Sequence, residues 1–182
     1  MKITETNIGG LLIIEPRIFN DDRGYFYESY NKSKFTDIGI AVDFVQDNQS
    51  FSQKGTLRGL HGQATPFAQG KLVRVIKGRV IDVAVDIRKG SPTYGQYFSI
   101  ELSEENKLQF WIPEGFLHGF VTLENDTIFT YKVNNYYDKA SEIGVKWNDP
   151  TLAINWQIDE SEVLLSPKDE VLPLFSSFVS PF

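Results

Sequence analysis

Short runs of alternating hydrophobic and polar residues, rich in β-branched and aromatic side chains, follow one another over most of the first 133 residues. Runs of this kind, separated by glycine, proline or asparagine, are typical of β-strands. We predict strands over residues 10–15, 25–30, 44–52, 71–77, 79–87, 94–102, 110–112, 116–123 and 127–133, the first two paired across a turn at 20–24. Short strands at this spacing indicate an all-β sandwich or barrel.

Two short helices are expected between and after these strands. Residues 32–39 contain Ser33 as a possible cap, with Phe35 and Ile38 on one face. Residues 166–169 place Ser166 at the cap and Pro167 at the first helical position, which proline favours. No repeat or linker divides the chain, so we expect one domain over residues 1–182, with 176–182 as a flexible tail.

One segment carries the strongest signal for chemistry. Arg58 lies three residues before His61, and Lys71 lies ten residues after it. If His61 faces a cavity, the two cations suit an anionic substrate and the imidazole supplies one proton-transfer group. The simpler alternative is a hydrogen-bonded structural histidine, which is commoner for a lone histidine near a strand.

Three further polar positions are open to two interpretations. Asp82 interrupts an apolar run, where a charge is costly unless it is paired, so it either bonds a partner such as His118 or faces solvent. Gln46 and Asn48 share one face of a strand and form either a solvated edge or a surface that reads a base or hydroxyl.

Composition narrows the possible functions. The 182 residues are 41% hydrophobic and 23% charged, as in ordinary soluble proteins, and a net charge of −6 argues against nucleic-acid binding. The absence of cysteine excludes disulfides, thiolate metal sites and cysteine nucleophiles. Because there is no signal-peptide core and no run long enough to span a membrane, we expect a cytoplasmic protein that does not bind membranes.

Elimination leaves acid/base chemistry without a cofactor. Two isolated histidines make a poor transition-metal site, and no phosphate loop, dinucleotide-binding glycine motif or nucleophile elbow is present. A histidine base, a carboxylate that orients it and a tyrosine acid remain possible.

A series of motifs runs in order along nearly the whole chain, from about Ile13 to Phe175. The motifs are Val45-Gln46-Asp47-Asn48, Leu57-Arg58-Gly59-Leu60-His61, Gln69-Gly70-Lys71-Leu72-Val73-Arg74, Asp82-Val83-Ala84-Val85-Asp86-Ile87-Arg88, Gly90-Ser91-Pro92-Thr93-Tyr94-Gly95, Ile112-Pro113-Glu114-Gly115-Phe116-Leu117-His118-Gly119-Phe120, Trp147-Asn148-Asp149 and Leu165-Ser166-Pro167-Lys168-Asp169. In content and order these motifs closely resemble the dTDP-4-dehydrorhamnose 3,5-epimerase family.

This resemblance implies a double-stranded β-helix (cupin) jelly roll and a homodimer whose N-terminal strands are exchanged. It also implies a reaction without metal or cofactor. The expected substrate is dTDP-4-dehydro-6-deoxy-D-glucose, whose C3 and C5 are inverted to give a precursor of L-rhamnose for polysaccharide biosynthesis.

The resemblance also assigns roles to particular residues. His61 would remove the protons and Asp169 would orient it, while Lys71 would stabilise the enolate and Tyr131 would return a proton from the opposite face. The implied binding residues are Arg58 and Lys168 for the diphosphate or sugar, Gln46 and Asn48 for the nucleotide, Tyr137 beside the thymine, His118 with Asp82 near the sugar, and Arg23, Phe26 and Glu28 contributed by the partner subunit.

Two departures from the family pattern affect the expected specificity. Gly62 occupies a position that is usually aromatic, so we expect more space beside His61, and Gln49 stands where relatives commonly have histidine. A single-carbon epimerase or a 3,4-ketoisomerase acting on a related nucleotide sugar therefore remains an alternative, although the Ser166–Asp169 motif argues against the ketoisomerase. A non-catalytic sugar-nucleotide-binding cupin is less consistent with the four retained catalytic positions.

Overall fold

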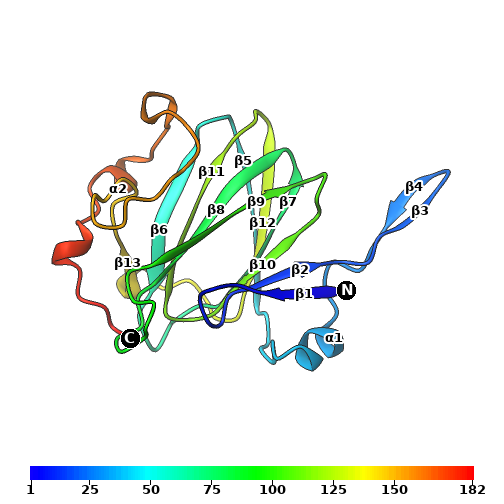
Figure 1. The fold of residues 1–182 in the computed structure, drawn as a ribbon, viewed down its shortest axis with the longest axis horizontal. Coiled ribbons are helices and arrows are strands. Elements are labelled where there is room, and N and C mark those ends of the chain that lie inside the picture. Colours follow the sequence, from blue (N-terminus) through cyan, green and yellow to red (C-terminus); the bar gives the residue numbers. More distant parts are fainter.

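Two antiparallel sheets face each other and make up most of the molecule, as a computed structural model describing residues 1–182 shows (Figure 1). The first sheet contains, in order, β1 (Lys2–Glu5), β2 (Leu12–Glu15), β10 (Gln109–Ile112), β7 (Lys71–Lys77), β12 (Thr127–Val133) and β5 (Gln46–Ser52). The second contains β13 (Glu142–Gly144), β6 (Leu57–Gln63), β11 (Phe116–Thr122), β8 (Arg79–Asp86) and β9 (Tyr97–Ser103). The predicted all-β class is confirmed.

The main core lies between the sheets and follows from the alternation of side chains along each strand. Val73 and Val75 of β7 point inward on the same face as Lys71, and they meet Val80 and Ala84 of β8. Phe120 and Phe129 stack across the core with ring centres 4.0 Å apart. Every second position of these strands is therefore apolar except where a strand reaches the cavity described below.

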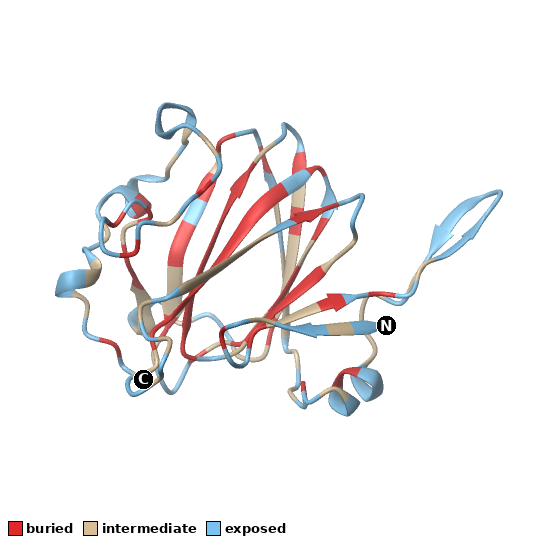
Figure 2. Cartoon of the chain, viewed as in Figure 1, coloured by how far each residue is buried: buried red, intermediate tan, exposed pale blue.

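A second apolar cluster covers the outer face of the five-stranded sheet. The C-terminal third supplies Trp147, Leu152 and Trp156, which pack on β8 and β11 residues such as Val83 and Leu117. Strand β8 is consequently buried on both faces (Figure 2), which explains its nearly continuous apolar run.

The last residues also pack here, in contrast to the flexible tail that we expected over 176–182. Phe178 and Phe182 contact the outer cluster, and Ser180 is 2% exposed. The Ser180 hydroxyl donates to the carbonyl of Ile87, while the amide of Lys89 donates to the carbonyl of Phe182 over 3.0 Å. These contacts were not visible in the sequence because the partners lie about ninety residues apart.

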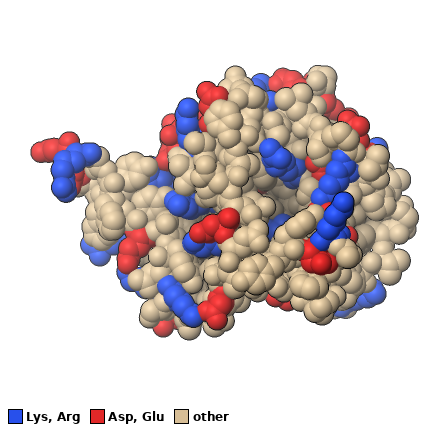
Figure 3. Space-filling view, turned by 180° about the vertical axis from the view of Figure 1, so that it is seen from behind, with Lys and Arg blue, Asp and Glu red and all other residues tan.

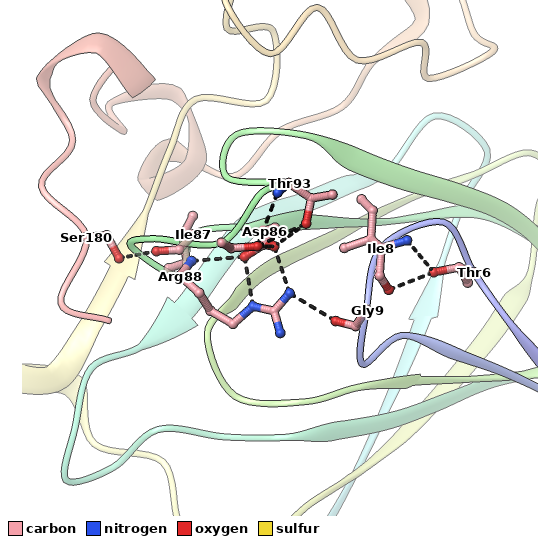
Figure 4. A network of polar contacts seen from close by, with 9 residues as sticks. Thr6, Ile8, Gly9, Asp86, Ile87, Arg88, Thr93 and Ser180 are labelled. Carbon is pink, nitrogen blue, oxygen red and sulfur yellow. Dashed lines mark hydrogen bonds and ion pairs between the residues drawn. The ribbon is translucent and has the colours of Figure 1, made fainter.

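A buried carboxylate organises one end of the jelly roll (Figure 4). Asp86 accepts hydrogen bonds from the Arg88 guanidinium at 2.7 and 2.9 Å, and from the hydroxyls of Ser91 and Thr93 at 2.6 and 2.7 Å. Arg88 also donates to the carbonyl of Gly9 at 2.9 Å. The network thus joins the N-terminal loop to the end of β8.

The N-terminal region differs most from the prediction. Strand β2 pairs with β1 and β10, whereas β3 (Phe19–Asp21) and β4 (Gly24–Phe26) form a hairpin of their own, so the pairing predicted between 10–15 and 25–30 is wrong. The polar residues of β1 and β3 gave no strand signal. The hairpin projects away from the body of the molecule and is exposed (Figures 1 and 2).

The helices are short. Helix α1 (Lys32–Asp37) is capped by Asn31 and not by Ser33, and α2 (Pro167–Glu170) is capped by Ser166 as predicted. Three 3-10 turns complete the structure: η1 (Lys139–Ser141), η2 (Glu160–Glu162) and η3 (Phe175–Ser177). None of the helices combines the length and apolar character needed to cross a membrane.

Candidate active site

A cavity of about 430 Å³ opens between the two sheets, and polar side chains dominate its wall. It is lined by Asn48, Gln49, Ser50, Arg58, His61, Lys71, His118, Phe120, Tyr131, Ser166, Lys168 and Asp169. The lining contains three cationic side chains, Arg58, Lys71 and Lys168, against one carboxylate, although the whole chain has a net charge of −6. Figure 3 shows a hollow on the back of the molecule with Lys and Arg side chains gathered around it. Such a wall suits an anionic ligand.

His61 and Asp169 meet in this cavity although 108 residues separate them. His61 Nε2 lies 2.5 Å from Asp169 Oδ1, and the Ser166 hydroxyl donates to Asp169 Oδ2 over 2.7 Å. The segment before α2 is held against β6 by main-chain bonds, since the amide of Leu57 donates to the carbonyl of Leu164 over 3.0 Å. Gly55 permits this approach, because a Cβ there would lie 2.1 Å from the carbonyl oxygen of Glu162.

The electrostatics of Asp169 favour its ionised form. Burial alone would raise the pKa of this carboxyl, but hydrogen bonds from His61 and Ser166 outweigh burial and hold the pKa below its ordinary value. Asp169 is therefore an anion at neutral pH and accepts the Nε2–H of His61. The other ring nitrogen, Nδ1, has no protein hydrogen-bond partner and is the atom that can take up a proton.

His118 and Asp82 form a second pair beside the first. His118 of β11 is opposite His61 of β6, and its Nε2 lies 2.9 and 3.0 Å from the two carboxylate oxygens of Asp82. Burial raises the pKa of Asp82 and lowers that of His118. Asp82 is 0% exposed, so the alternative in which it faces solvent is wrong.

Lys71 and Tyr131 come from the opposite sheet to His61. Burial lowers the pKa of Lys71 to about 8, so the ammonium group is still mostly charged at pH 7. Its Nζ lies 5.9 Å from the centre of the Tyr131 ring. Burial raises the pKa of Tyr131, which therefore keeps its phenolic proton at neutral pH.

The predicted binding residues are brought together only in part. Arg58, Asn48 and Lys168 line the cavity, whereas Gln46 lies outside its lining and donates to Asn48 Oδ1 over 2.8 Å. Lys168 forms an ion pair with Glu142. Glu142 was not singled out from the sequence, because nothing near it in the chain marks it.

Four predicted residues do not reach the cavity of their own chain. The side chain of Arg23 is 90% exposed and pairs with Asp21, and Phe26 is 66% exposed. Glu28 pairs with Lys34 outside the cavity. Tyr137 is 55% exposed, and its hydroxyl lies 3.4 Å from Glu142.

Gly62 does not affect the cavity as we expected. Successive residues of a strand face opposite sides, and His61 faces inward. A Cβ on Gly62 would instead meet the carbonyl oxygen of Phe116 and the side chains of Leu117 and Ile143, at 3.2 to 3.4 Å. The expectation of extra space beside His61 is therefore wrong.

Sequence reasoning also missed Ser50, whose hydroxyl is buried in the cavity wall without a hydrogen-bond partner. The two-residue period of β5 places Ser50 on the same face as Gln46 and Asn48, and this signal could have identified it.

Comparison with known proteins identifies the family. The family model described as dTDP-4-dehydrorhamnose 3,5-epimerase matches residues 5–177. The enzyme of that name from Shigella flexneri is 52% identical over 170 residues, which are 93% of each chain.

Solved structures agree with the sequence match. The crystal structure of dTDP-4-dehydrorhamnose 3,5-epimerase from Elizabethkingia anophelis has a TM-score of 0.93 and 51% identity, covering 97% of each chain. The Legionella pneumophila enzyme RmlC in complex with dTDP-4-keto-L-rhamnose has a TM-score of 0.93 and 51% identity, covering 98% of this chain and 94% of that one. These likenesses confirm the predicted cupin-type jelly roll. The chain belongs to the dTDP-4-dehydrorhamnose 3,5-epimerase family of isomerases.

Proposed function

We propose that this chain inverts C3 and C5 of dTDP-4-dehydro-6-deoxy-D-glucose to give dTDP-4-dehydro-L-rhamnose. The observation that carries the proposal is the placement of a histidine–carboxylate pair and a protonated tyrosine on opposite walls of one basic cavity. The names of the relatives and the sugar nucleotide bound to the Legionella enzyme agree with this substrate.

His61 is the proposed base. The C4 ketone of the substrate acidifies the hydrogens on C3 and C5, and His61 Nδ1 accepts one of them while Nε2–H donates to Asp169. The carboxylate fixes the imidazole tautomer and stabilises the imidazolium that forms. The electron pair of the broken C–H bond moves into the ring and produces an enolate with its charge on the C4 oxygen.

Lys71 is the proposed stabiliser of that enolate. Its side chain is half-buried in the cavity wall, where a charge acts more strongly on a developing oxyanion than it would in water. His118, held by Asp82, is the proposed second contact to the same part of the sugar, because it also lines the cavity.

Tyr131 is the proposed acid. It belongs to β12 in the six-stranded sheet, whereas His61 belongs to β6 in the five-stranded sheet, so the two groups approach the sugar from opposite walls. Protonation of the enolate carbon by the Tyr131 hydroxyl restores the ketone with inverted configuration. The imidazolium and the phenolate then recover their starting forms through solvent, and the cycle repeats at the second carbon.

A second copy of the chain completes the nucleotide site in this proposal. The exposed hairpin β3–β4 carries Arg23 and Phe26, and Glu28 follows it. An isolated two-stranded ribbon with exposed aromatic residues is marginally stable in water, which favours its packing on another surface. We propose a homodimer in which the hairpin reaches the partner's cavity, where Arg58 and Lys168 hold the diphosphate.

Conversion of the substrate tests the function. Purified protein is mixed with dTDP-4-dehydro-6-deoxy-D-glucose, and the sugar is followed by proton NMR. We expect dTDP-4-dehydro-L-rhamnose, and a loss of about a thousandfold or more in rate for His61→Asn, whose carboxamide can still form hydrogen bonds but cannot act as the base. A purified wild-type protein that leaves both carbons unchanged would refute the proposal.

A further inference from the structure

The carboxylate of Asp169 is held on both of its oxygens, and only one of these bonds goes to His61. The second oxygen, Oδ2, accepts the Ser166 hydroxyl hydrogen bond over 2.7 Å. The same hydroxyl oxygen accepts the main-chain N–H of Asp169 over 3.3 Å, as the cap of α2. One side chain therefore ties the carboxylate of Asp169 to the backbone of Asp169.

This double contact leaves the carboxylate little freedom. Asp169 is 3% exposed, and with Oδ2 bound to Ser166 the remaining oxygen, Oδ1, faces His61 Nε2 at 2.5 Å. A carboxylate that could rotate would present either oxygen to the imidazole. The tautomer of His61 depends on this bond, because the hydrogen bond at one ring nitrogen determines which nitrogen carries the proton.

The other charged and titratable groups around this pair lie farther along the cavity wall. They are Arg58 on β6, Lys71 on β7, Tyr131 on β12, His118 on β11 with Asp82 behind it, and Lys168 on α2 paired with Glu142. None of them forms a hydrogen bond with Asp169.

We propose that Ser166 is a positioning residue for the epimerisation, because its hydroxyl fixes the Asp169 carboxylate so that His61 keeps its proton on Nε2 and its free electron pair on Nδ1. This inference rests on the proposed function and adds a residue that acts through Asp169 and does not react with the sugar.

Ser166→Gly tests the proposal with little disturbance of the fold, since glycine is also well tolerated as the cap of a helix. Ser166→Thr keeps both the cap and the donor. The control is Ser161→Gly, because Ser161 also donates its hydroxyl to an aspartate, Asp159, over 2.6 Å, in an exposed pair away from the cavity.

The pH dependence of kcat/KM is the kinetic measurement. The Ser166 bond helps to hold the pKa of Asp169 down, so its loss raises that pKa and moves the acid limb to higher pH. At pH 7 we expect kcat to fall about five- to tenfold with KM changed less than twofold. Ser166→Thr recovers most of the rate, and Ser161→Gly matches the wild type.

Nitrogen NMR of the unliganded protein gives a readout that does not need activity. The wild type is expected to show the Nε2–H tautomer of neutral His61, and Ser166→Gly is expected to show a mixture of tautomers. If the wild type has no epimerase activity but Ser166→Gly still converts the single tautomer of His61 into a mixture, the proposed function fails while the positioning role stands. A Ser166→Gly protein with the wild-type acid limb and a single tautomer would overturn the positioning role.

A second variant keeps the test decisive if Ser166→Gly proves unstable. Ser166→Ala also lacks the donor for the carboxylate, and alanine restricts the backbone more than glycine does. It should lose the single tautomer as well, and retention of that tautomer would again overturn the proposal.

Discussion

Individual side chains divide the proposed reaction between the two sheets. The proposed base His61 and its carboxylate partner Asp169 lie on β6 and α2, whereas the proposed acid Tyr131 and the cation of Lys71 lie on β12 and β7. Burial shifts the pKa values of Lys71 and Tyr131, and hydrogen-bond partners hold down the pKa of Asp169. Substitutions of single residues should therefore separate the steps of the reaction.

Tyr131→Phe should separate proton removal from inversion. His61 can still remove a proton and return deuterium to the same face, so in D₂O we expect exchange at the sugar carbons without the inverted product. The measurement is proton NMR of the sugar with the variant. Formation of inverted product at the wild-type rate would exclude Tyr131 as the acid.

Asp169→Asn should lower kcat by about a thousandfold while changing KM little, because the amide removes the charge that stabilises the imidazolium and can favour the wrong tautomer. Steady-state kinetics at pH 7 checks this. Asp159→Asn, an exposed carboxylate bonded to Ser161, is the control and should behave as the wild type. A loss smaller than tenfold for Asp169→Asn would contradict the assigned role.

Lys71 should set the basic limb of the rate profile. Its charged form is the active one, and burial lowers its pKa to about 8, so kcat/KM should fall as the pH rises through about 8. Lys71→Arg remains charged over this range, and its residual activity should show no such limb. A limb near pH 8 that persists in Lys71→Arg would assign the titration to another group.

At the scale of elements, polar networks stabilise the ends of the jelly roll as well as apolar packing does. The example is the network around Asp86 at the end of β8. Burial alone would raise the pKa of Asp86, but hydrogen bonds from Arg88, Ser91 and Thr93 lower it to about 2. A carboxyl whose pKa is lowered on folding stabilises the protein above its unfolded pKa, and this contribution is lost as the pH falls through the folded value.

Asp86→Asn should therefore lower the free energy of unfolding by about 2 kcal/mol at pH 7. The difference from the wild type should shrink as the pH falls from about 4 towards 2. Denaturant unfolding over this pH range is the measurement. An equal difference at every pH would mean that the charge of Asp86 does not contribute.

Some strands could be predicted accurately from the sequence and others could not, for physical reasons. The long β-branched runs of β7, β8 and β12 were placed within a residue or so, since alternation and burial act on each residue locally. Strands β1 and β13 were missed because they are short edge strands with few buried side chains. Their existence depends on partners distant in the sequence.

In the candidate site, too, single residues could be predicted from the sequence, whereas contacts between distant segments could not. The resemblance to the family named His61, Asp169, Lys71 and Tyr131. It did not show what brings His61 and Asp169 together, which are main-chain bonds around Gly55 and Leu164. The outward orientation of Gly62 follows from the alternation of side chains along a strand, because its neighbour His61 faces inward. We drew the opposite expectation from the family pattern, in which this position is usually aromatic.

At the scale of the whole molecule, the proposed dimer can be tested by mixing two inactive variants. Arg23→Ala damages the hairpin, and His61→Asn damages the cavity. If the hairpin serves the partner's cavity, a mixed dimer has one intact site, and an equal mixture should recover about a quarter of the wild-type activity. The measurement is activity after co-refolding, with each variant alone as the control. No recovery, or a monomer in sedimentation velocity, would contradict the exchange.

The central claim is that one base and one acid invert two carbons in the same cavity. The most direct measurement is proton NMR of dTDP-4-dehydro-6-deoxy-D-glucose turned over by the wild-type protein in D₂O. The account predicts that solvent deuterium appears at both C3 and C5 of an inverted product. Deuterium at only one carbon would show a single-carbon epimerase, and no incorporation at either carbon would contradict the account.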